Sequence, residues 1–308
     1  MLVEAFRMAQ RARERAGLIV AADVDPFAPA LAAADLGLVA PRTEENGFVS
    51  WLEAISIRHA PLLILTLYER DLCVLEPMRP KLNDLGAWLV GMPTDSLKIC
   101  IDKQKLVEMC AEIGVAAPAT WPGDSLASIP LESFPLILKK RAGRGSRGQH
   151  FARNLEELSG LVNADPTQFC IQQVIAGTEF GLDVINDLEG RFVTVFAREK
   201  ISMREGETAV ARTADPERFS VVARALSARL AHQGCMDVDV IVSGDGVVLL
   251  DINPRFGGGY PFSHLAGADL PAALLCWTTG EKPDARWFQP QVGLIAAKAS
   301  TVVRLHEF

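Results

Sequence analysis

Residues 236–259, MDVDVIVSGDGVVLLDINPRFGGG, decide the fold of this chain. Apolar and polar residues alternate on both sides of Gly244-Asp245-Gly246, and this pattern predicts an antiparallel hairpin with a three-residue loop. That loop sets a register with one entirely apolar face, on which the predicted pairs are Val238–Ile252, Val240–Leu250 and Val242–Val248. A slip of one residue would mix the two faces, so the alternation itself fixes the register.

The other face of this hairpin is acidic. Asp239 is predicted to lie opposite Asp251, next to the pair formed by Asp237 and Asn253. Opposed carboxylates destabilise a sheet unless a positive charge lies beside them. A divalent hard cation would supply that charge, because Asp239, Asp251 and Asn253 offer oxygen ligands. A solvated acidic face with Arg255 as its partner is the simpler alternative.

A second informative stretch is the glycine-rich loop 143–148, GRGSRG, which matches G-x-G-x-x-G. A dinucleotide-binding fingerprint should open a helix, but the residues that follow, QHFAR, alternate as in a strand. A P-loop also fails, because Gln149-His150 stands where Lys and Ser or Thr are required. The remaining interpretation is a flap between two strands whose backbone N–H groups cover phosphates.

Five cations lie in or beside this loop: Lys139, Lys140, Arg141, Arg144 and Arg147. In a chain with a net charge of −7, such a cluster favours a polyanionic ligand. A solvated basic turn is again the simpler alternative. Aromatic residues do not alternate with these cations, which argues against a nucleic-acid surface.

The first hundred residues alternate between strands and helices. LIVAADVD (18–25) and PLLILTL (61–67) are predicted buried strands, while residues 2–16, ending at Gly17, and residues 48–56 have helical periodicity. This alternation predicts a parallel sheet with its ligand edge at the carboxyl ends of the strands. Such a sheet usually begins with a strand, but this sequence begins with a helix, so we expect its usual first strand to be missing.

Helix caps and turn residues divide the remainder of the chain. Asp102 is expected to cap a helix over 103–113 that Gly114 ends. A boundary is expected near residue 120, followed by a small unit of strand, strand, helix and strand over 134–141, 149–153, 154–162 and 167–175. A longer helix should follow, with Asp215 as its N-cap, Pro216 in its first turn and Gly234 at its end.

Composition restricts the function classes. The 308 residues are 49% hydrophobic and 22% charged, and the net charge of −7 argues against a nucleic-acid-binding or anionic-membrane-binding protein. The apolar runs are too short to cross a membrane, and the first residues lack the apolar core of a signal peptide. Six cysteines are scattered in apolar surroundings without a C-x-x-C pair, so we expect reduced core cysteines in a cytoplasmic protein.

Taken together, the motifs resemble the ATP-grasp superfamily, in the branch of the carbamoyl-phosphate-synthase large subunit and the single-unit carboxylate–amine ligases. Four stretches occur in the family's order: Asp102-Lys103, FPLILKKRAGRGSRG (134–148), CIQQVIAGTEFGLDV (170–184) and the hairpin that ends in NPRFGGG (253–259). One such motif would be weak evidence, but four in order are specific.

The resemblance implies an α/β chain with an ATP-grasp fold that is α+β in its ATP-grasp part. Residues 1–95 would form a truncated Rossmann-like domain that precedes the ATP-grasp domain. Residues 96–308 would form the ATP-grasp domain itself, with a lid subdomain at 120–172 that carries the glycine-rich loop 143–148.

The nucleotide-binding roles implied by the resemblance fall on four parts of the chain. Lys103 and Lys139 would contact the phosphates of ATP, with Lys139 also near the adenine. The glycine-rich loop would cover the phosphates at Gly145, Ser146 and Gly148. The adenine would lie against a hinge formed by Gln172, Gln173, Val174 and Ile175, and Glu179 would bind the ribose hydroxyls.

The metal and catalytic roles fall mainly on the hairpin. The resemblance implies that Asp239, Asp251 and Asn253 hold Mg²⁺, with Mn²⁺ as a substitute. Arg255, with Lys139 and Asn253, would stabilise the transferred phosphoryl group. Asp251 stands where the family usually has Glu, so a carboxylate that bridges two metal ions would reach less far.

The activity implied by the resemblance is ATP-dependent ligation of a small carboxylate to an amine through an acyl phosphate. The family also suggests a homodimer. Carbamoyl phosphate synthesis itself is not expected, because the chain is one unit without a duplication or a glutaminase segment. Substrate recognition is expected from the segment 197–213, with Arg198, Lys200, Arg204 and Glu207 as candidates, and from the end of PLLILTLYERD; His264 is expected to be structural.

Two other function classes stay open. One is a catalytically silent ATP-binding subunit with a regulatory or partner role. The other is a Rossmann-type oxidoreductase, against which the predicted strand after Gly148 argues.

Overall fold

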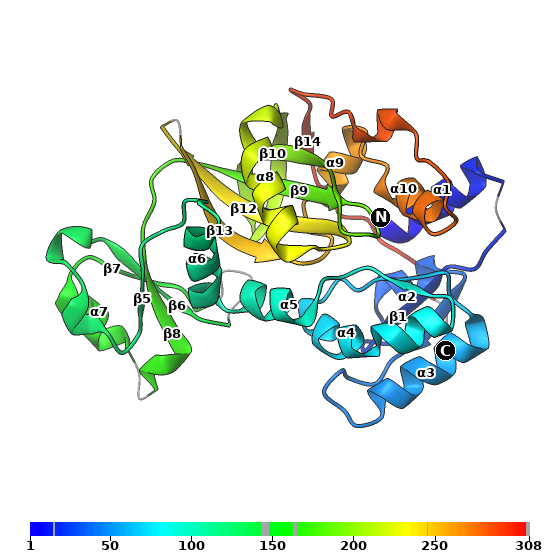
Figure 1. Ribbon diagram of the computed structural model, residues 1–308, viewed down its shortest axis with the longest axis horizontal. Coiled ribbons are helices and arrows are strands. Elements are labelled where there is room, and N and C mark those ends of the chain that lie inside the picture. Colours follow the sequence, from blue (N-terminus) through cyan, green and yellow to red (C-terminus); the bar gives the residue numbers. More distant parts are fainter. Residues whose placement is uncertain (15, 143–147, 163–164, 245, 306–308) are drawn as a thin grey trace.

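A six-stranded antiparallel sheet is the largest element of the computed structural model, which describes residues 1–14, 16–142, 148–162, 165–244 and 246–305. Its strands, in spatial order, are β13 (Gly246–Asn253), β12 (Gly234–Ser243), β9 (Thr178–Asn186), β10 (Phe192–Arg204), β11 (Glu207–Ala214) and β14 (Ile295–Ala297). Figure 1 shows this sheet between a small unit at one end of the molecule and the N-terminal part of the chain at the other. The predicted hairpin thus forms one edge of the main sheet.

The register of this hairpin is confirmed at the end that carries the acidic residues, where the pairs are Asp237–Asn253, Val238–Ile252 and Asp239–Asp251. Past Asp239 a register shift intervenes, and Val240 pairs with Leu249. The predicted pairings of Val240 with Leu250 and of Val242 with Val248 are therefore wrong, since Val242 pairs with Val247. The three-residue loop is wrong as well, because Ser243 pairs with Gly246.

The register shift adds one residue to β13 and changes which side chains face the core. Leu249 is buried in the main core, whereas the half-buried Leu250 lines a cavity on the other face. Leu250 and Asp251 therefore both face the cavity although they are consecutive. A β-bulge permits this, and strict alternation along a strand does not.

The apolar face of the main sheet is covered by helices α6 (Lys103–Glu112) and α8 (Glu217–Leu230). They contribute Leu106, Met109, Phe219, Ala223, Leu226 and Leu230 to one core with Val238, Val240 and Ile252. Burial of apolar surface stabilises this layer by about 25 cal/mol per Å². The acidic side chains are consequently directed to the opposite face.

The small unit contains a four-stranded sheet in the order β5 (Thr120–Pro122), β8 (Phe169–Gln173), β6 (Leu136–Lys140) and β7 (His150–Ala152). Helix α7 (Leu155–Leu161) packs against β6 and β7. Three short 3₁₀ helices complete the unit, at Leu126–Ser128, Leu131–Ser133 and Pro166–Gln168. The strands and the helix expected between residues 134 and 175 are confirmed.

The N-terminal part contains two separate pairs of parallel strands. β1 (Val20–Asp23) pairs with β2 (Leu36–Val39), and β3 (Leu63–Ile64) pairs with β4 (Trp88–Leu89). The helices of this part are α1 (Leu2–Ala12), α2 (Pro29–Ala33), α3 (Phe48–His59) and α4 (Glu69–Asp84). Parallel pairing across helical connections agrees with the α/β prediction, although the described strands do not join into one sheet. The domain division at residue 95 stays a prediction.

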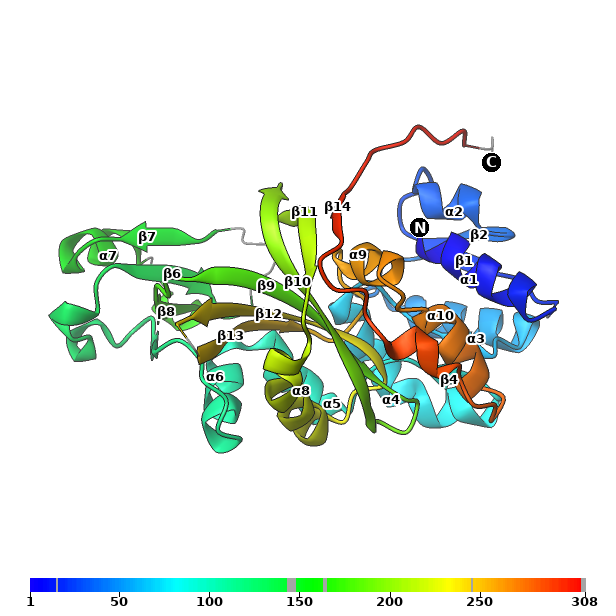
Figure 2. The ribbon, with the colours of Figure 1, turned by 90° about the horizontal axis from the view of Figure 1, so that it is seen from above.

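The remaining helices lie between these parts and at the end of the chain. They are α5 (Thr94–Ile101), α9 (Tyr260–Leu265), α10 (Leu270–Trp277) and a 3₁₀ helix at Ala285–Phe288. Helix α10 packs against α1, so the start of the chain lies beside a late helix (Figure 1). In Figure 2 the residues after β14 run away from the main sheet, toward the side on which α2 lies.

Two predicted helix ends are wrong. Helix α1 ends at Ala12 rather than near Gly17. Helix α8 ends at Leu230 rather than near Gly234. The left-handed residue at its end is Ala231 (φ 50°) instead of the expected glycine. Gly234 instead opens β12.

One of the two predicted N-caps is confirmed. The Asp102 carboxylate accepts a hydrogen bond from the Gln104 N–H at 3.0 Å, and α6 ends just before Gly114. The second is wrong by one residue, because Pro216 is the N-cap of α8, and Asp215 precedes it and accepts a hydrogen bond from the Glu217 N–H at 3.0 Å.

All six cysteines are free thiols, and five of them are buried as expected. Cys73 is the exception, because it lies exposed on α4. Across the part of the chain that the structure describes, no helix is both long and apolar enough to cross a membrane.

A buried polar cluster joins the end of α8 to the main sheet. The ring of His232 is fully enclosed, with Nε2 3.0 Å from the Val184 carbonyl and Nδ1 3.2 Å from the Asn186 amide nitrogen. The neutral ring satisfies both contacts, because Nε2–H donates to the carbonyl while Nδ1 accepts from the amide. Burial lowers the pKa of His232 to about 4.

We expect acidification to destabilise the protein through His232. The unfolded chain binds a proton near pH 6.5, whereas the folded protein does not until about pH 4. The stability contributed by the neutral ring is therefore complete above pH 6.5 and is lost as the pH falls toward 4. At pH 5 this loss amounts to about 2 kcal/mol.

Urea unfolding at pH 7 and pH 5 measures this loss, with His232→Gln as the reference. Glutamine keeps an N–H donor for the Val184 carbonyl but does not titrate. The variant should lose about 2 kcal/mol less than the wild-type protein between the two pH values. Equal losses in the two proteins would contradict the assignment.

Candidate active site

A cavity of about 610 Å³ adjoins the acidic face of the main sheet, the small unit and the glycine turn at 257–259. Seven of the predicted site residues line it: Lys103, Lys139, Glu179, Asp239, Asp251, Asn253 and Arg255. They come from α6, β6, β9, β12, β13 and the turn that follows β13. This volume is typical of small-molecule sites. The structure thus brings together residues that lie far apart in the sequence.

Lys103 supplies one of the positive charges that the opposed carboxylates require. Its Nζ lies 3.3 Å from Oδ1 of Asp251, and its side chain is almost entirely buried. The Lys103 N–H also donates to the carbonyl of Arg141 at 3.1 Å. The start of α6 therefore fixes this lysine both to the acidic strand and to the base of the glycine-rich loop.

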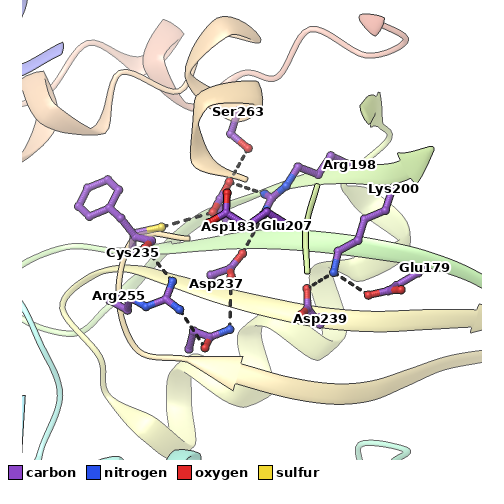
Figure 3. Close-up of polar contacts among 12 residues, drawn as sticks. Glu179, Asp183, Arg198, Lys200, Glu207, Cys235, Asp237, Asp239, Arg255 and Ser263 are labelled. Atoms are coloured by element: carbon purple, nitrogen blue, oxygen red, sulfur yellow. Dashed lines mark hydrogen bonds and ion pairs between the residues drawn. The ribbon is translucent and has the colours of Figure 1, made fainter. Parts of the chain in front are cut away.

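Lys200 supplies a second charge, on the other side of Asp239. Its Nζ lies 2.7 Å from Oδ1 of Asp239 and 2.6 Å from Oε1 of Glu179, and its side chain is 6% exposed. Figure 3 shows the ammonium group between these two carboxylates. Sequence patterns suggest Lys200 for substrate recognition, but the structure places it between the residues predicted for the metal and for the ribose.

Burial and charge shift the pKa values of these groups. Burial, with the negative charge of Asp237, raises the pKa of Asp239 to about 6, although Lys200 acts in the opposite direction. Burial lowers the pKa of Lys200, but Asp239 and Glu179 outweigh it, so that its pKa is raised overall. Burial and the neighbouring charge of Lys103 lower the pKa of Lys139. The acidic face can carry its charge only with cations beside it.

Arg255 is held in place by three acceptors. Nη2 lies 3.1 Å from Oδ1 of Asn253, Nη1 donates to the Phe256 carbonyl at 3.0 Å, and Nε lies 3.4 Å from Oε2 of Glu69. Glu69 begins α4 and belongs to PLLILTLYERD, the segment that the sequence places at the ligand edge of the N-terminal sheet. The N-terminal part of the chain therefore contributes to the site.

Beneath the glycine turn lies a buried ionic network centred on Arg198. Its Nη1 lies 2.6 Å from Asp183 and its Nη2 lies 2.7 Å from Asp237, while Ser263 donates to Asp183 at 2.5 Å (Figure 3). A Cβ added at Gly259 would lie 2.0 Å from the guanidinium, so the turn rests directly on it. Two carboxylates neutralise Arg198, which makes it a support for the turn rather than a receptor for an anionic substrate.

Of the other two residues suggested for substrate recognition, one lines the cavity and one does not. Glu207 lines the cavity and forms an ion pair with Lys298 at 2.7 Å. Arg204 is exposed at the β10–β11 turn and does not line the cavity. Nδ1 of His264 lies 3.0 Å from the Ala268 carbonyl, which agrees with the expected structural role.

The base of the glycine-rich loop is fastened to α6. Arg141 donates to both oxygens of the Asp102 carboxylate, with Nη2 at 2.6 Å and Nε at 3.2 Å. Gly148 has φ 70° and lies outside the cavity lining, while the next residue, Gln149, belongs to it. The predicted phosphate contacts at Gly145 and Ser146 lie outside the described residues.

The predicted adenine hinge does not line this cavity. Gln172 is buried inside the small sheet, where its amide donates to the Thr120 hydroxyl at 3.1 Å. The Gln173 N–H donates to the Ala119 carbonyl at 2.9 Å, and its side chain is exposed. Val174 and Ile175 are half-buried in the segment that connects β8 to β9. The hinge role of these four residues stays a prediction.

Two cavity residues, Gln149 and Leu250, are not expected there from the sequence. Three others, Leu67, Met203 and Thr208, lie in the two segments that are expected to recognise substrate. Gln149 directly follows the glycine-rich loop, so its position could have been inferred from the loop. The alternation of β13 assigns Leu250 to the core, and only the bulge places it in the cavity.

The oxygen atoms of Asp239, Asp251 and Asn253 suit Mg²⁺, which binds one or two carboxylates when phosphates complete its coordination. Within the ranges that the structure describes, no three His, Cys, Asp or Glu side chains are grouped to hold a metal by themselves. The two carboxylates are instead bonded to lysines. These residues therefore fit a metal that binds together with phosphate ligands.

Two family models and several known proteins match this chain. Residues 100–259 match the family described as the ATP-grasp domain, and residues 1–90 match the PylC-like, N-terminal domain. Two curated relatives are large chains of carbamoyl phosphate synthase. The arginine-specific chain of Bacillus subtilis is 22% identical over 190 residues, which cover 56% of this chain and 18% of that protein. The chain of Thermus thermophilus is 24% identical over 213 residues, covering 63% and 21%. This chain spans about a fifth of the curated relatives that it matches.

Solved structures share the fold over most of this chain. A biotin carboxylase from Campylobacter jejuni has a TM-score of 0.73 at 15% identity, over 94% of this chain and 71% of that one. A carboxyaminoimidazole ribonucleotide synthase from Aspergillus clavatus, complexed with ATP, has a TM-score of 0.72 at 13% identity, over 94% and 77%. Such identities show the fold alone, but the family match covers just over half of the 308 residues. The chain belongs to the ATP-grasp family.

Proposed function

We propose that this protein is an ATP-dependent carboxylate–amine ligase that forms an amide through an acyl phosphate. The observation that carries the proposal is the convergence of Lys103, Lys139, Lys200 and Arg255 with two opposed carboxylates on one cavity. Such a set of charges suits a nucleotide triphosphate bound with a metal ion. The membership of the ATP-grasp family supports this ligand.

In this proposal each group would have a binding role. Lys103 and Lys139 would bind the phosphates, and Glu179 would bind the ribose. Asp239, Asp251 and Asn253 would hold Mg²⁺, which supplies positive charge to the phosphate oxygens when it is bound. Phosphoryl transfer needs mainly positioning and charge stabilisation, and these side chains provide both.

The reaction proceeds in two steps. An oxygen of the substrate carboxylate attacks the γ-phosphorus in line, and the bond from that phosphorus to the leaving oxygen of ADP breaks. The amine nitrogen then attacks the acyl carbon, inorganic phosphate leaves and the nitrogen loses a proton. Arg255 would stabilise the transferred phosphoryl group, because its planar guanidinium is already oriented by Asn253, Phe256 and Glu69.

The small unit would protect the acyl phosphate from water. Lys139 and Lys140 of β6 and Gln149 beyond the glycine-rich loop line the cavity on that side. The ion pair between Asp102 and Arg141 fastens the base of this loop beside Lys103. Closure over the phosphates would exclude water, which otherwise hydrolyses such intermediates.

We expect ADP release from Mg²⁺–ATP only when a small carboxylate and an amine are both supplied. Pools of amino acids and other small carboxylates serve as the first screen, with ADP measured by a coupled assay. Arg255→Ala should lower turnover by about 10²- to 10³-fold, because a donor to the transferring group is removed. The affinity for ATP, measured by calorimetry, should change much less.

Arg286→Ala is the matched control, because Arg286 is exposed, forms its ion pair with Asp284 and does not line the cavity. Its turnover should equal that of the wild-type protein. ATP binding without ADP release in any pool would favour the catalytically silent nucleotide-binding protein. A failure to bind ATP at all would overturn the proposed site.

We expect Asp251→Asn to weaken binding of the Mn²⁺–ATP complex by about tenfold or more, because the amide removes the negative charge that a hard cation requires. Binding of ATP alone in the presence of a chelator should not weaken, since Lys103 keeps its position on α6. Asp95→Asn is the control, because Asp95 lies exposed on α5 in an ion pair with Lys98. Equal weakening with and without metal would indicate a structural role for Asp251.

A further inference from the structure

Lys200 occupies the place in the cavity where the proposed ligands converge. Its ammonium group lies 2.6 Å from Glu179 and 2.7 Å from Asp239 (Figure 3). The Lys200 side chain is 6% exposed. Under the proposed function, Glu179 binds the ribose and Asp239 binds the metal. Both carboxylates are therefore bonded to Lys200 in this structure and are required by the nucleotide complex when it binds.

The fold gives Lys200 this reach. It lies on β10, while Asp239 lies on β12 with β9 between them, so the two backbones are separated by about 10 Å. The residue of β9 that pairs with both Asp239 and Arg198 is Gly181. A Cβ added at Gly181 would lie 2.9–3.0 Å from the guanidinium of Arg198, so the glycine leaves room for that side chain to cross β9. Lys200 follows two residues later on the same face of β10, and its ammonium group reaches Glu179 of β9 and Asp239 of β12. Lysine has the length and the terminal charge to make this crossing.

A metal ion at Asp239 would compete with Lys200 for the same carboxylate. Two like charges cannot share one carboxylate at bonding distance in a buried site without strong repulsion. Binding of a metal–nucleotide complex therefore requires the ammonium group to leave Asp239. Its burial, with the remaining bond to Glu179 on the same wall, keeps it inside the cavity rather than in solvent.

A displaced lysine in this cavity needs another anion. An ammonium group has three N–H donors and stays charged only with acceptors nearby when it is buried. The phosphate chain that enters with the metal is the nearest incoming source of negative charge, because Asp239 would bind that metal directly. The charge of Lys200 would then pass from a protein carboxylate to the nucleotide.

We propose that Lys200 is an internal counter-ion that the metal–nucleotide complex displaces from Asp239, and that its ammonium group then binds the phosphates. This inference rests on the proposed function for the identity of the ligand. The geometry favours it over a purely structural ion pair, because the bond to Asp239 lies on the cavity wall and closes the proposed metal position.

The experiment measures Mn²⁺ binding by the full chain with and without ATP, using electron paramagnetic resonance to count free Mn²⁺. In Lys200→Met, Asp239 loses its counter-ion, so Mn²⁺ alone should bind about tenfold more tightly than to the wild-type protein. ATP in the presence of saturating Mn²⁺ should bind about tenfold more weakly, because a phosphate donor is missing. The same substitution therefore shifts the two affinities in opposite directions.

Two further variants control the result. Lys200→Arg keeps the charge and should leave the affinity for Mn²⁺ alone close to the wild-type value, which separates charge from packing. Lys98→Met removes an exposed ion-paired lysine on α5 and should change neither affinity. Thermal melting followed by circular dichroism shows whether each variant is folded, and Lys200→Arg alone still tests the proposal if Lys200→Met is not.

The outcomes separate this inference from the proposed function. Unchanged or weaker binding of Mn²⁺ alone to folded Lys200→Met would overturn the displacement. An unchanged affinity for ATP would overturn the phosphate contact. Opposite shifts without ADP release from any substrate pool would support Lys200 while contradicting the ligase. If neither the wild-type protein nor Lys200→Met binds Mn²⁺ or ATP, both proposals are wrong.

Discussion

The repulsion between Asp239 and Asp251 is the constraint around which the site is arranged. They lie directly opposite each other on β12 and β13. Neither can move away, because their strand neighbours Val238, Val240 and Ile252 are packed into the core. Positive charge therefore has to come to them. Lys103 reaches Asp251 from α6, and Lys200 reaches Asp239 across β9. Three segments that are distant in the sequence, namely α6, β10 and the hairpin of β12 and β13, are thereby fixed at one cavity.

A second buried charge network sets the shape of this cavity. Arg198 bonds to Asp183 and Asp237 and supports the glycine turn, and the closeness of its guanidinium to Gly259 leaves no room for a side chain there. Removing one partner from a buried ion pair is costly, because the other charge is left without compensation. The glycine turn that follows Arg255 is thus held by a buried ionic network at the cavity wall.

Much of this arrangement could be predicted from the sequence, because alternation along β12 and β13 states which side chains share a face. The pair Asp239–Asp251 is predicted correctly even though the loop is one residue shorter than expected, because the bulge after Asp239 compensates for that difference. Alternation fails at Leu250, because a bulge adds a residue there that no local sequence pattern predicts. It also cannot distinguish Arg198 from Lys200, two basic residues on the same face of β10. Their different partners depend on Asp183 and Asp239, which lie on other strands.

These observations change how ligand binding at this site should be understood. The acidic face is already neutralised by lysines, so a metal–nucleotide complex would exchange partners with the protein rather than fill a set of unsatisfied groups. Exchange costs less than burying new charge, because the cations and anions are desolvated before the ligand arrives. Such an exchange would not require a preformed three-ligand metal cluster, and the described residues contain none. Metal and phosphates would enter together. The metal would replace Lys200 as the cation beside Asp239, and the phosphates would replace Asp239 as the anion beside Lys200.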